Sequence, residues 1–249
     1  MFQFSGQADS HKTEEGLIPS SHWGEDVLID SNLIKERFDD IKNKIAPYKT
    51  RIIAVTKYYG LHAVINGYKA GLREFGESRA LDAVKKIESL PEDVRKNSVF
   101  HFIGHLQTNK AEKVVEYFDY IHSVDSLKVA QAISKAACSL NKREKVLLQV
   151  NNACEEQKFG YETEQLKKEF SQILNLESLD VVGLMNMAPL GADSDTLHRL
   201  FGDLRRLRDE LQAEFGVELP ELSMGMSDDY EIAVEEGATM IRVGRKLFK

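Results

Sequence analysis

The sequence predicts a single α/β domain folded as a closed (β/α)8 barrel, or TIM barrel, with an extra helix on its N-terminal side. The chain has 249 residues, which is close to the usual length of such a barrel. Eight short apolar segments alternate with amphipathic segments, and this alternation is typical of a parallel sheet. No linker or low-complexity stretch divides the sequence. An open doubly wound sheet is the alternative, but eight short and evenly spaced strands favour the closed barrel.

The extra helix covers residues 31–45. Its apolar residues recur at helical spacing and form one stripe, which consists of Ile34, Phe38, Ile41 and Ile45. Asp30 or Ser31 can cap its start, and Pro47 follows its end. The preceding segment, residues 1–30, is polar, and we expect it to form a mobile tail. It has no basic start followed by an apolar core, so we do not expect a secretory signal.

The eight predicted strands are short and rich in apolar, β-branched residues, as in the segment RIIAV. They cover residues 51–57, 74–76, 99–104, 120–124, 145–150, 180–187, 222–226 and 240–243. Amphipathic helices separate them and cover residues 61–70, 78–90, 108–118, 126–140, 162–174, 195–215 and 229–236. Asp125 is expected to cap the helix at 126–140, and Pro91 closes the helix at 78–90. Because no helix is expected after the last strand, the helix at 31–45 can take the place of the eighth one.

The composition argues against several classes of protein. Lys and Arg number 33 and Asp and Glu number 40, so the net charge is −7, and the two signs are interspersed. Nucleic-acid binding needs a clustered basic face and is not expected. No apolar run approaches the ~18 residues of a membrane span. Cys138 and Cys154 form no disulfide framework and no CxxC pair, which favours a reducing compartment, and we expect a cytoplasmic protein.

The first strand ends in Thr56 and Lys57, at the end of the barrel where functional groups gather. A lysine at this position can simply extend its charged head into water from the rim. It can also be an amine that its apolar strand desolvates, with a lowered pKa, and that forms a Schiff base with an aldehyde. Position alone leaves both interpretations open.

The segments 223–227 and 242–245 end the last two strands, where barrels of this kind usually hold a phosphate group. Small residues let backbone N–H groups approach phosphate oxygens, although the glycines can also serve only to turn the chain. Asp228 and Asp229 would repel a dianion at the start of the next helix. We therefore expect phosphate at Ser223, Gly225 and Gly244.

The third strand carries His101 and His105, which are four residues apart and are expected to share a face. No third ligand of suitable spacing follows, so histidines that pack or form hydrogen bonds are favoured, and no metal site is predicted. Cys154 has no adjacent histidine and is not a candidate nucleophile. Dinucleotide-binding and Walker-type glycine loops are absent from the sequence.

Together these segments resemble one family, the pyridoxal phosphate homeostasis proteins, which are also called PLP-binding proteins. The chain looks like the barrel domain of alanine racemase standing alone. The matching motifs extend over residues 51–248 and include AVTK (54–57), FGES (75–78), HFIGHLQTNK (101–110), KFGY (158–161), GLMNMAP (183–189) and LSMGMSDDYEIAVEEGATMIRVG (222–244). The third and the last of these are long and specific.

The resemblance implies a bound cofactor, pyridoxal 5'-phosphate (PLP), held as a covalent aldimine on Lys57. It implies that the phosphate lies at Ser223, Gly225, Gly244 and Arg245, and that Met224 also belongs to the cofactor-binding residues. Arg242 would face the pyridine nitrogen, and the ring pocket would consist of Ser78, His101, Ile103 and Met226. The family usually has Asn in place of Ser78 and Ser or Thr in place of Arg245, so the contacts of these two residues differ here.

The resemblance further implies a monomeric protein that carries and buffers PLP in vitamin B6 homeostasis without catalysis. Its partners would be PLP and, as recipients, PLP-dependent apo-enzymes. A PLP-dependent racemase-like enzyme is the alternative. A racemase needs acid–base groups on both faces of the substrate Cα, and in alanine racemases the second comes from an additional domain of the partner subunit, which we do not expect here. A Schiff-base aldolase acting on a phosphosugar would share the lysine and the phosphate site.

Overall fold

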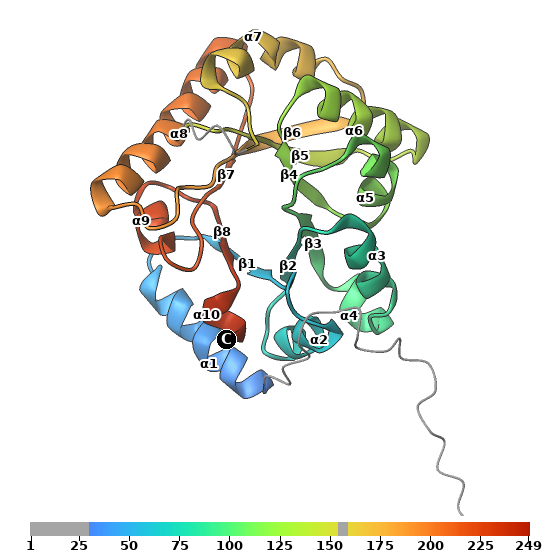
Figure 1. Cartoon of the computed structure of the whole chain (residues 1–249), viewed down its shortest axis with the longest axis vertical. Coiled ribbons are helices and arrows are strands. Elements are labelled where there is room, and N and C mark those ends of the chain that lie inside the picture. Colours follow the sequence, from blue (N-terminus) through green and yellow to red (C-terminus); the bar gives the residue numbers. More distant parts are fainter. Residues whose placement is uncertain (1–29, 154–158) are drawn as a thin grey trace, which may run out of the picture.

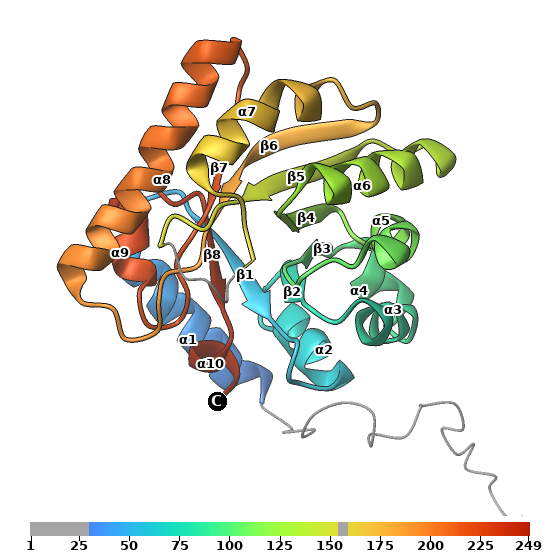
Figure 2. The same cartoon turned by 45° about the horizontal axis from the view of Figure 1, so that its top comes forward.

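The computed structural model describes residues 30–153 and 159–249, and it confirms the closed barrel. Eight parallel strands are hydrogen-bonded in chain order, and the last closes on the first. Figure 1 looks into this ring of strands, and Figure 2 shows it tilted. The strands are β1 (Arg51–Val55), β2 (Glu74–Glu77), β3 (Val99–Phe102), β4 (Tyr120–Val124), β5 (Glu144–Gln149), β6 (Leu179–Met185), β7 (Glu221–Ser223) and β8 (Met240–Val243).

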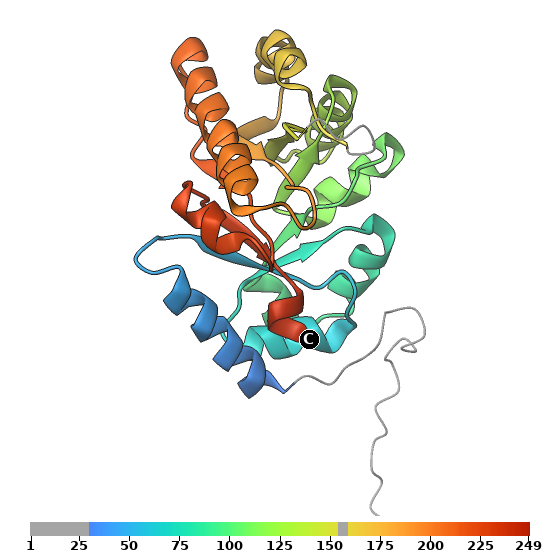
Figure 3. The same ribbon diagram turned by 60° about the vertical axis from the view of Figure 1, so that its left-hand side comes forward.

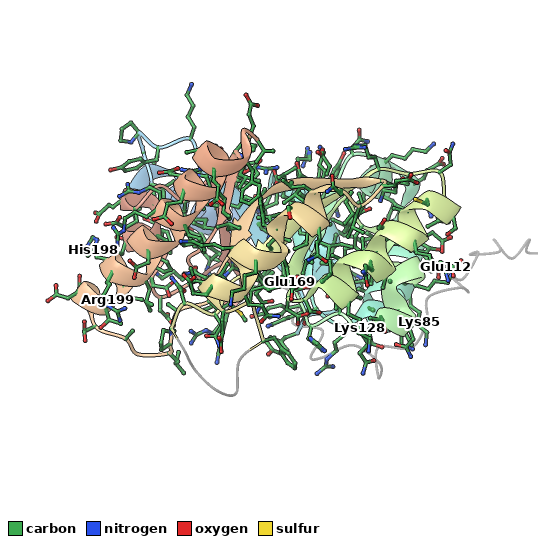
Figure 4. The ribbon with its side chains drawn as sticks, turned by 90° about the horizontal axis from the view of Figure 1, so that it is seen from above. Lys85, Glu112, Lys128, Glu169, His198 and Arg199 are labelled. Atoms are coloured by element: carbon green, nitrogen blue, oxygen red, sulfur yellow. The ribbon has the colours of Figure 1, made fainter. Side chains whose placement is uncertain are left out.

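Helices surround the strands as an outer layer (Figure 1). They are α1 (Ser31–Lys44), α2 (Leu61–Lys69), α3 (Ala80–Glu88), α4 (Glu92–Lys96), α5 (Ala111–Tyr117), α6 (Leu127–Ser139), α7 (Thr163–Leu174), α8 (Ser194–Phe215), α9 (Tyr230–Glu235) and α10 (Arg245–Phe248). Their inner faces bury apolar side chains against the strands, as the leucine stripe of α8 does. Charged side chains such as Lys85 on α3, Lys128 on α6 and Arg199 on α8 lie on the outside (Figure 4).

The last strand is followed by a helix, which corrects the prediction that β8 ends the sequence of elements. This helix, α10, is a single turn, too short to produce a recognisable apolar period. It packs beside α1, and the two lie together in Figure 3. Arg37 of α1 donates to the carbonyl of Leu247 at 3.1 Å. The space that an eighth outer helix would cover is therefore filled by α1 and α10 together.

Several boundaries differ from those predicted. Ser126 caps α6 through its hydroxyl, which accepts from the Val129 N–H, so the expected cap at Asp125 is wrong by one residue. A further short helix, α4, starts after Pro91, where the sequence predicts no helix. The strand predicted at 222–226 stops at Ser223, because Gly225 adopts a φ of +88° and turns the chain away. An added Cβ at Gly225 would lie only 2.6 Å from the Cβ of Ala233, so glycine is required there.

The interior of the barrel contains an apolar cluster and, separately, a group of polar side chains. Ile53, Leu147, Met185 and Met240 pack with Tyr120 as one cluster within the ring of strands. Polar side chains are also buried inside it, and His101, His122, Ser223 and Arg242 are each at most 4% exposed. Buried polar groups require hydrogen-bond partners, and theirs are described below.

In the described part of the chain, no helix is long and apolar enough to cross a membrane. Among the same residues, no group of three or more His, Cys, Asp and Glu side chains is arranged to hold a metal ion. The predicted tail lies outside the described residues, apart from Asp30, whose side chain accepts from the Asn32 N–H at 3.0 Å and caps α1. Cys154 also lies outside the described residues.

Candidate functional site

A cavity of about 380 Å³ opens at the carboxyl ends of the strands, where barrels of this type place their functional groups. Its wall comes from the segments that follow β1, β3, β6, β7 and β8. The lining residues are Val55, Lys57, Tyr58, Tyr59, Ile103, Met187, Pro189, Leu190, Gly191, Ala192, Leu197, Met226, Ser227, Asp228, Asp229, Arg242, Gly244 and Arg245. The wall is mostly apolar with a few charged groups, as is usual for a site that binds a small molecule.

Lys57 stands on the wall of this cavity. It follows β1 directly, and the buried residues of that strand place its backbone at the rim. Its side chain is half-buried, and its Nζ atom lies 5.0 Å from the centre of the Tyr58 ring. An amine at this position can contact a molecule in the cavity while its stem packs on apolar surface.

Arg242 supplies the most deeply buried charge in the cavity wall. It lies on β8 and is 4% exposed. Its Nη1 donates to Ser223 Oγ at 2.6 Å, and its Nη2 donates to the carbonyl of Asn186 at 2.7 Å. Burial lowers the pKa of this guanidinium to about 10, partly offset by the charge of Asp229. Arg242 is therefore still a cation at neutral pH, held rigidly at two of its five N–H groups.

A chain of buried polar groups continues from Ser223 along the inside of the barrel. Ser223 Oγ lies 2.8 Å from His122 Nδ1, and His122 Nε2 lies 2.9 Å from His101 Nδ1. His101 Nε2 then lies 3.1 Å from a carboxylate oxygen of Glu74. Arg51 pairs with Glu74 at 3.5 Å, at the opposite end of the barrel from the cavity.

The direction of the hydrogen bonds in this chain is fixed by its ends. Burial lowers the pKa of His101 and, more strongly, that of His122, so both rings are neutral. A guanidinium has no acceptor, so the Ser223 oxygen accepts from Arg242 and its hydroxyl donates to His122. Each imidazole then accepts at Nδ1 and keeps its proton at Nε2, which in His101 faces Glu74. This series of hydrogen bonds thus holds Arg242 as a donor toward the cavity.

The segments after β7 and β8 form the other polar end of the cavity. Gly244 caps α10, and the first N–H groups of a helix have no acceptor within it. An added Cβ at Gly244 would lie 3.2 Å from the Val55 carbonyl oxygen, so a larger residue would crowd β1. Asp228 forms an ion pair with Arg245, and Asp229 accepts from the Met226 N–H at 2.5 Å. These contacts offset the repulsion that the two aspartates would exert on an anion.

Six of the residues predicted to bind the cofactor line the cavity, and these are Lys57, Ile103, Met226, Arg242, Gly244 and Arg245. Ser223, Met224 and Gly225 do not line it, because β7 ends at Ser223 and the chain reaches the cavity only at Met226. His101 lies deeper, in the buried chain. His105 is beyond the end of β3, in contact with Asp125 and stacked on Phe159, so the two histidines do not share a strand face.

Ser78 does not line this cavity but lies in a second one of about 430 Å³, whose lining also includes Arg79, Gln107 and Lys110. Ser227 lines the main cavity and is only 6% exposed, but it was not among the predicted residues. Two small hydroxyl residues, Ser223 and Ser227, follow each other closely in the sequence. The sequence does not show which of the two lines the cavity, because that depends on where β7 ends.

The sequence of this chain matches a known family of proteins. The profile of the alanine racemase N-terminal domain matches residues 29–249. A pyridoxal phosphate homeostasis protein of Synechocystis is 44% identical over 204 residues, which cover 81% of this chain and 92% of the relative. The protein of the same name from Aquifex aeolicus is 41% identical over 199 residues, 80% of this chain and 86% of the relative.

The chain belongs to the pyridoxal phosphate homeostasis protein family. A solved structure, PipY of Synechococcus elongatus with PLP bound, is 39% identical and superimposes with a TM-score of 0.79. The match covers 87% of this chain and 100% of PipY. An alanine racemase of Clostridium difficile has a TM-score of 0.71 at 15% identity, which shows a shared barrel fold only.

Proposed function

We propose that this chain binds PLP in the cavity and carries and buffers it, with the cofactor attached to Lys57 through a Schiff base. The single observation that carries the proposal is that one cavity combines a rim amine, a buried guanidinium and the glycine-containing start of a helix. The PLP-bound structure of PipY, which is 39% identical to this chain, supports it. The names of the relatives support a role in PLP homeostasis.

The residues present fit each part of the cofactor. Lys57 would hold the aldehyde carbon, and the bond forms with the loss of one water molecule. Arg242 would donate to the ring nitrogen, because its remaining N–H groups belong to a side chain that lines the cavity. Gly244, Arg245 and Ser227 would hold the phosphate through N–H, guanidinium and hydroxyl donors.

PLP supplies a reactive aldehyde and a ring that can serve as an electron sink. The side chains of this cavity bind the cofactor and restrain that chemistry. The positive charge of Arg242 disfavours a proton on the ring nitrogen, so the sink is weak. Among the described lining residues, the tyrosines Tyr58 and Tyr59 come from the same turn as Lys57, and both aspartates are engaged in contacts. We therefore propose a carrier without catalytic turnover. The recipient apo-enzymes, the monomeric state and the cytoplasmic location stay predictions.

The test is the absorbance spectrum of the purified protein with PLP, recorded before and after borohydride treatment. A Schiff base absorbs in the visible range, and borohydride fixes it as a stable adduct. The variant Lys57→Ala should lose the visible band and the adduct. Lys246→Ala, which removes an exposed lysine of α10 that does not line the cavity, should keep both.

Peptide mapping of the reduced protein identifies the attachment site. The adduct is expected on the peptide that contains residue 57. An adduct on a different peptide, or a protein that binds no PLP, would overturn the assignment. A protein that binds a phosphosugar aldehyde but not PLP would favour the aldolase interpretation.

A further inference from the structure

A buried ion pair lies directly beneath the turn that carries Lys57. Lys86 of α3 and Glu77 of β2 approach within 2.7 Å, and their side chains are 3% and 4% exposed. Neither residue lines the cavity. The pair therefore does not contact a ligand there.

The ammonium of Lys86 is bonded to the backbone on both sides of Lys57. Its Nζ donates to the Thr56 carbonyl at 3.0 Å and to the Tyr59 carbonyl at 2.8 Å. The Tyr59 N–H donates to the same Thr56 carbonyl at 3.0 Å and closes the turn. The two carbonyls that flank Lys57 and Tyr58 are thus bonded to one cation.

Glu77 completes the contact from the neighbouring strand. Its Oε1 atom accepts from Lys86 and also from the Thr56 hydroxyl at 2.7 Å. A backbone hydrogen bond joins the same two segments, since the Thr56 N–H donates to the Gly76 carbonyl at 3.0 Å. Thr56 itself is fully buried. The residue before Lys57 is consequently fixed at its N–H, its carbonyl and its hydroxyl.

Stability alone is a poor reason for such a pair. The desolvation of two buried charges consumes most of their attraction, and replacing a buried pair with apolar residues is often neutral or stabilising. A functional group is, however, placed accurately when packing and hydrogen bonds from the residues behind it lock its position. The distinctive feature of this pair is that both of its side chains form hydrogen bonds with the turn that contains Lys57.

We infer that Glu77 and Lys86 are positioning residues that fix the turn of residues 56–59, so that the amine of Lys57 meets the aldehyde of a bound ligand. This inference rests on the proposed function. It separates two properties of the site. The affinity for the rest of the ligand depends on the cavity wall, whereas the rate of Schiff-base formation depends also on the pair beneath the turn.

The variant Lys86→Met tests this, because it keeps a long apolar stem and removes the ammonium. Two quantities are measured on the full chain. One is the affinity for pyridoxine 5'-phosphate, which has no aldehyde, and we expect it to stay within about twofold of wild type. The other is the rate of appearance of the visible band at saturating PLP, which we expect to fall about tenfold or more. This tenfold loss corresponds to about 1.4 kcal/mol in the activation barrier.

Lys85→Met is the matched control, because Lys85 is the exposed neighbour of Lys86 on the same helix (Figure 4). It should leave both quantities unchanged. Lys86→Arg, which restores a donor, should recover part of the rate. If Lys86→Met does not fold, Glu77→Gln serves in its place and should show the same separation of rate from affinity.

A Lys86→Met or Glu77→Gln protein that forms the Schiff base at the wild-type rate would overturn the positioning role. So would a variant whose rate and affinity fall together, since a general loss of structure has that effect. These results differ from failure of the proposed function, in which the wild-type chain itself forms no Schiff base.

Discussion

Arg242 determines which kind of ligand atom can lie at the buried end of the cavity. It has five N–H donors and no acceptor, and the pKa of about 10 that its burial produces leaves it protonated at neutral pH. The bonds to Ser223 and to the Asn186 carbonyl fix its plane. A ligand atom that meets it must therefore be a hydrogen-bond acceptor, such as an unprotonated ring nitrogen.

Ser223→Ala and Ser227→Ala are expected to affect different properties, the first the stability of the protein and the second its affinity for the ligand. Ser227→Ala removes a hydroxyl from the cavity wall and should weaken the binding of pyridoxine 5'-phosphate by about 1.5–3 kcal/mol, or roughly ten- to a hundredfold in Kd. Ser223→Ala leaves Arg242 Nη1 and His122 Nδ1 without their partner. It should lower the unfolding free energy by about 1–3 kcal/mol.

Titration calorimetry measures the first effect, and denaturant unfolding of the ligand-free protein measures the second. Each variant is the control for the other. If Ser223→Ala lowers the affinity strongly while Ser227→Ala does not, the phosphate lies where the sequence alone had placed it. The contribution of Ser227 to the cavity wall would then be only steric.

At the scale of elements, the sequence predicts the number, order and type of the strands, because each is a short apolar run between clear helix signals. β4 and β8 are predicted at their observed ends. The end of β7 is not predictable from composition, since the run from Leu222 to Met226 is uniformly apolar or small. The break comes from the close approach of Gly225 to α9, which is a tertiary contact. This one boundary is the reason that Ser223 and Gly225, two of the predicted phosphate residues, do not line the cavity.

The buried chain of Ser223, His122 and His101 could not be predicted either. It joins β7, β4 and β3, and nothing in the sequence links three polar residues so far apart. His122 gave no signal of its own, since it lies in an ordinary apolar strand. Lys57, Arg242 and Gly244 were placed at the cavity because each stands at the end of a strand, where the barrel fold alone determines position.

The helix that follows β6 is expected to hold part of the cavity wall through its cap. Asp193 caps α8 by accepting from the Thr196 N–H at 2.8 Å, and the residues just before it, from Pro189 to Ala192, line the cavity. This N–H holds the pKa of the Asp193 carboxyl below its usual value. Asp193→Ala should lower the melting temperature by a few degrees.

Asp193→Asn keeps a side-chain oxygen and should recover most of that loss. Thermal unfolding followed by circular dichroism at neutral pH provides the measurement. Equal melting temperatures for the alanine variant and the wild type would show that the cap contributes nothing to the stability of α8.

At the scale of the whole molecule, the two ends of the barrel differ in their electrostatics. The cavity wall carries three cations, Lys57, Arg242 and Arg245, against two carboxylates, Asp228 and Asp229. The opposite end carries Glu74 and Glu221, both paired with Arg51, and Glu144, which pairs with Lys142 at 2.8 Å. The excess of cations favours an anionic ligand at the first end, whereas the carboxylates at the second end are paired with cations of the same end.

Glu144 should make the stability of the protein fall as the pH rises. Burial raises its pKa from an ordinary 4.5 to about 7, against the opposing effect of Lys142. Its favourable contribution is complete below pH 4.5 and is lost as the pH rises through 7, because the unfolded chain ionises first. Glu144→Gln should therefore gain about 3 kcal/mol relative to wild type between these limits, at about 1.4 kcal/mol per pKa unit.

Urea unfolding of both proteins at pH 4.5 and pH 8 tests this. The difference between the variant and the wild type is the relevant quantity, because other titrating groups are common to both. A difference that does not change with pH would show that Lys142 compensates the buried carboxylate fully.

The absence of catalytic turnover is the prediction that concerns the molecule as a whole, since it depends on both faces of the cavity. A racemase removes the Cα proton of its substrate on one face and returns it on the other, which requires two placed acid–base groups. Here Lys57 stands on one wall, Asp228 and Asp229 are held by Arg245 and by a backbone N–H, and Arg242 disfavours a protonated ring. We expect the PLP-loaded protein to exchange the Cα proton of L-alanine in deuterated water no faster than free PLP does.

Nuclear magnetic resonance detects this exchange directly. If exchange occurs at a rate typical of an enzyme and Lys57→Ala abolishes it, the racemase-like alternative is favoured. The variant Tyr59→Phe would then show whether Tyr59 supplies the second acid–base group.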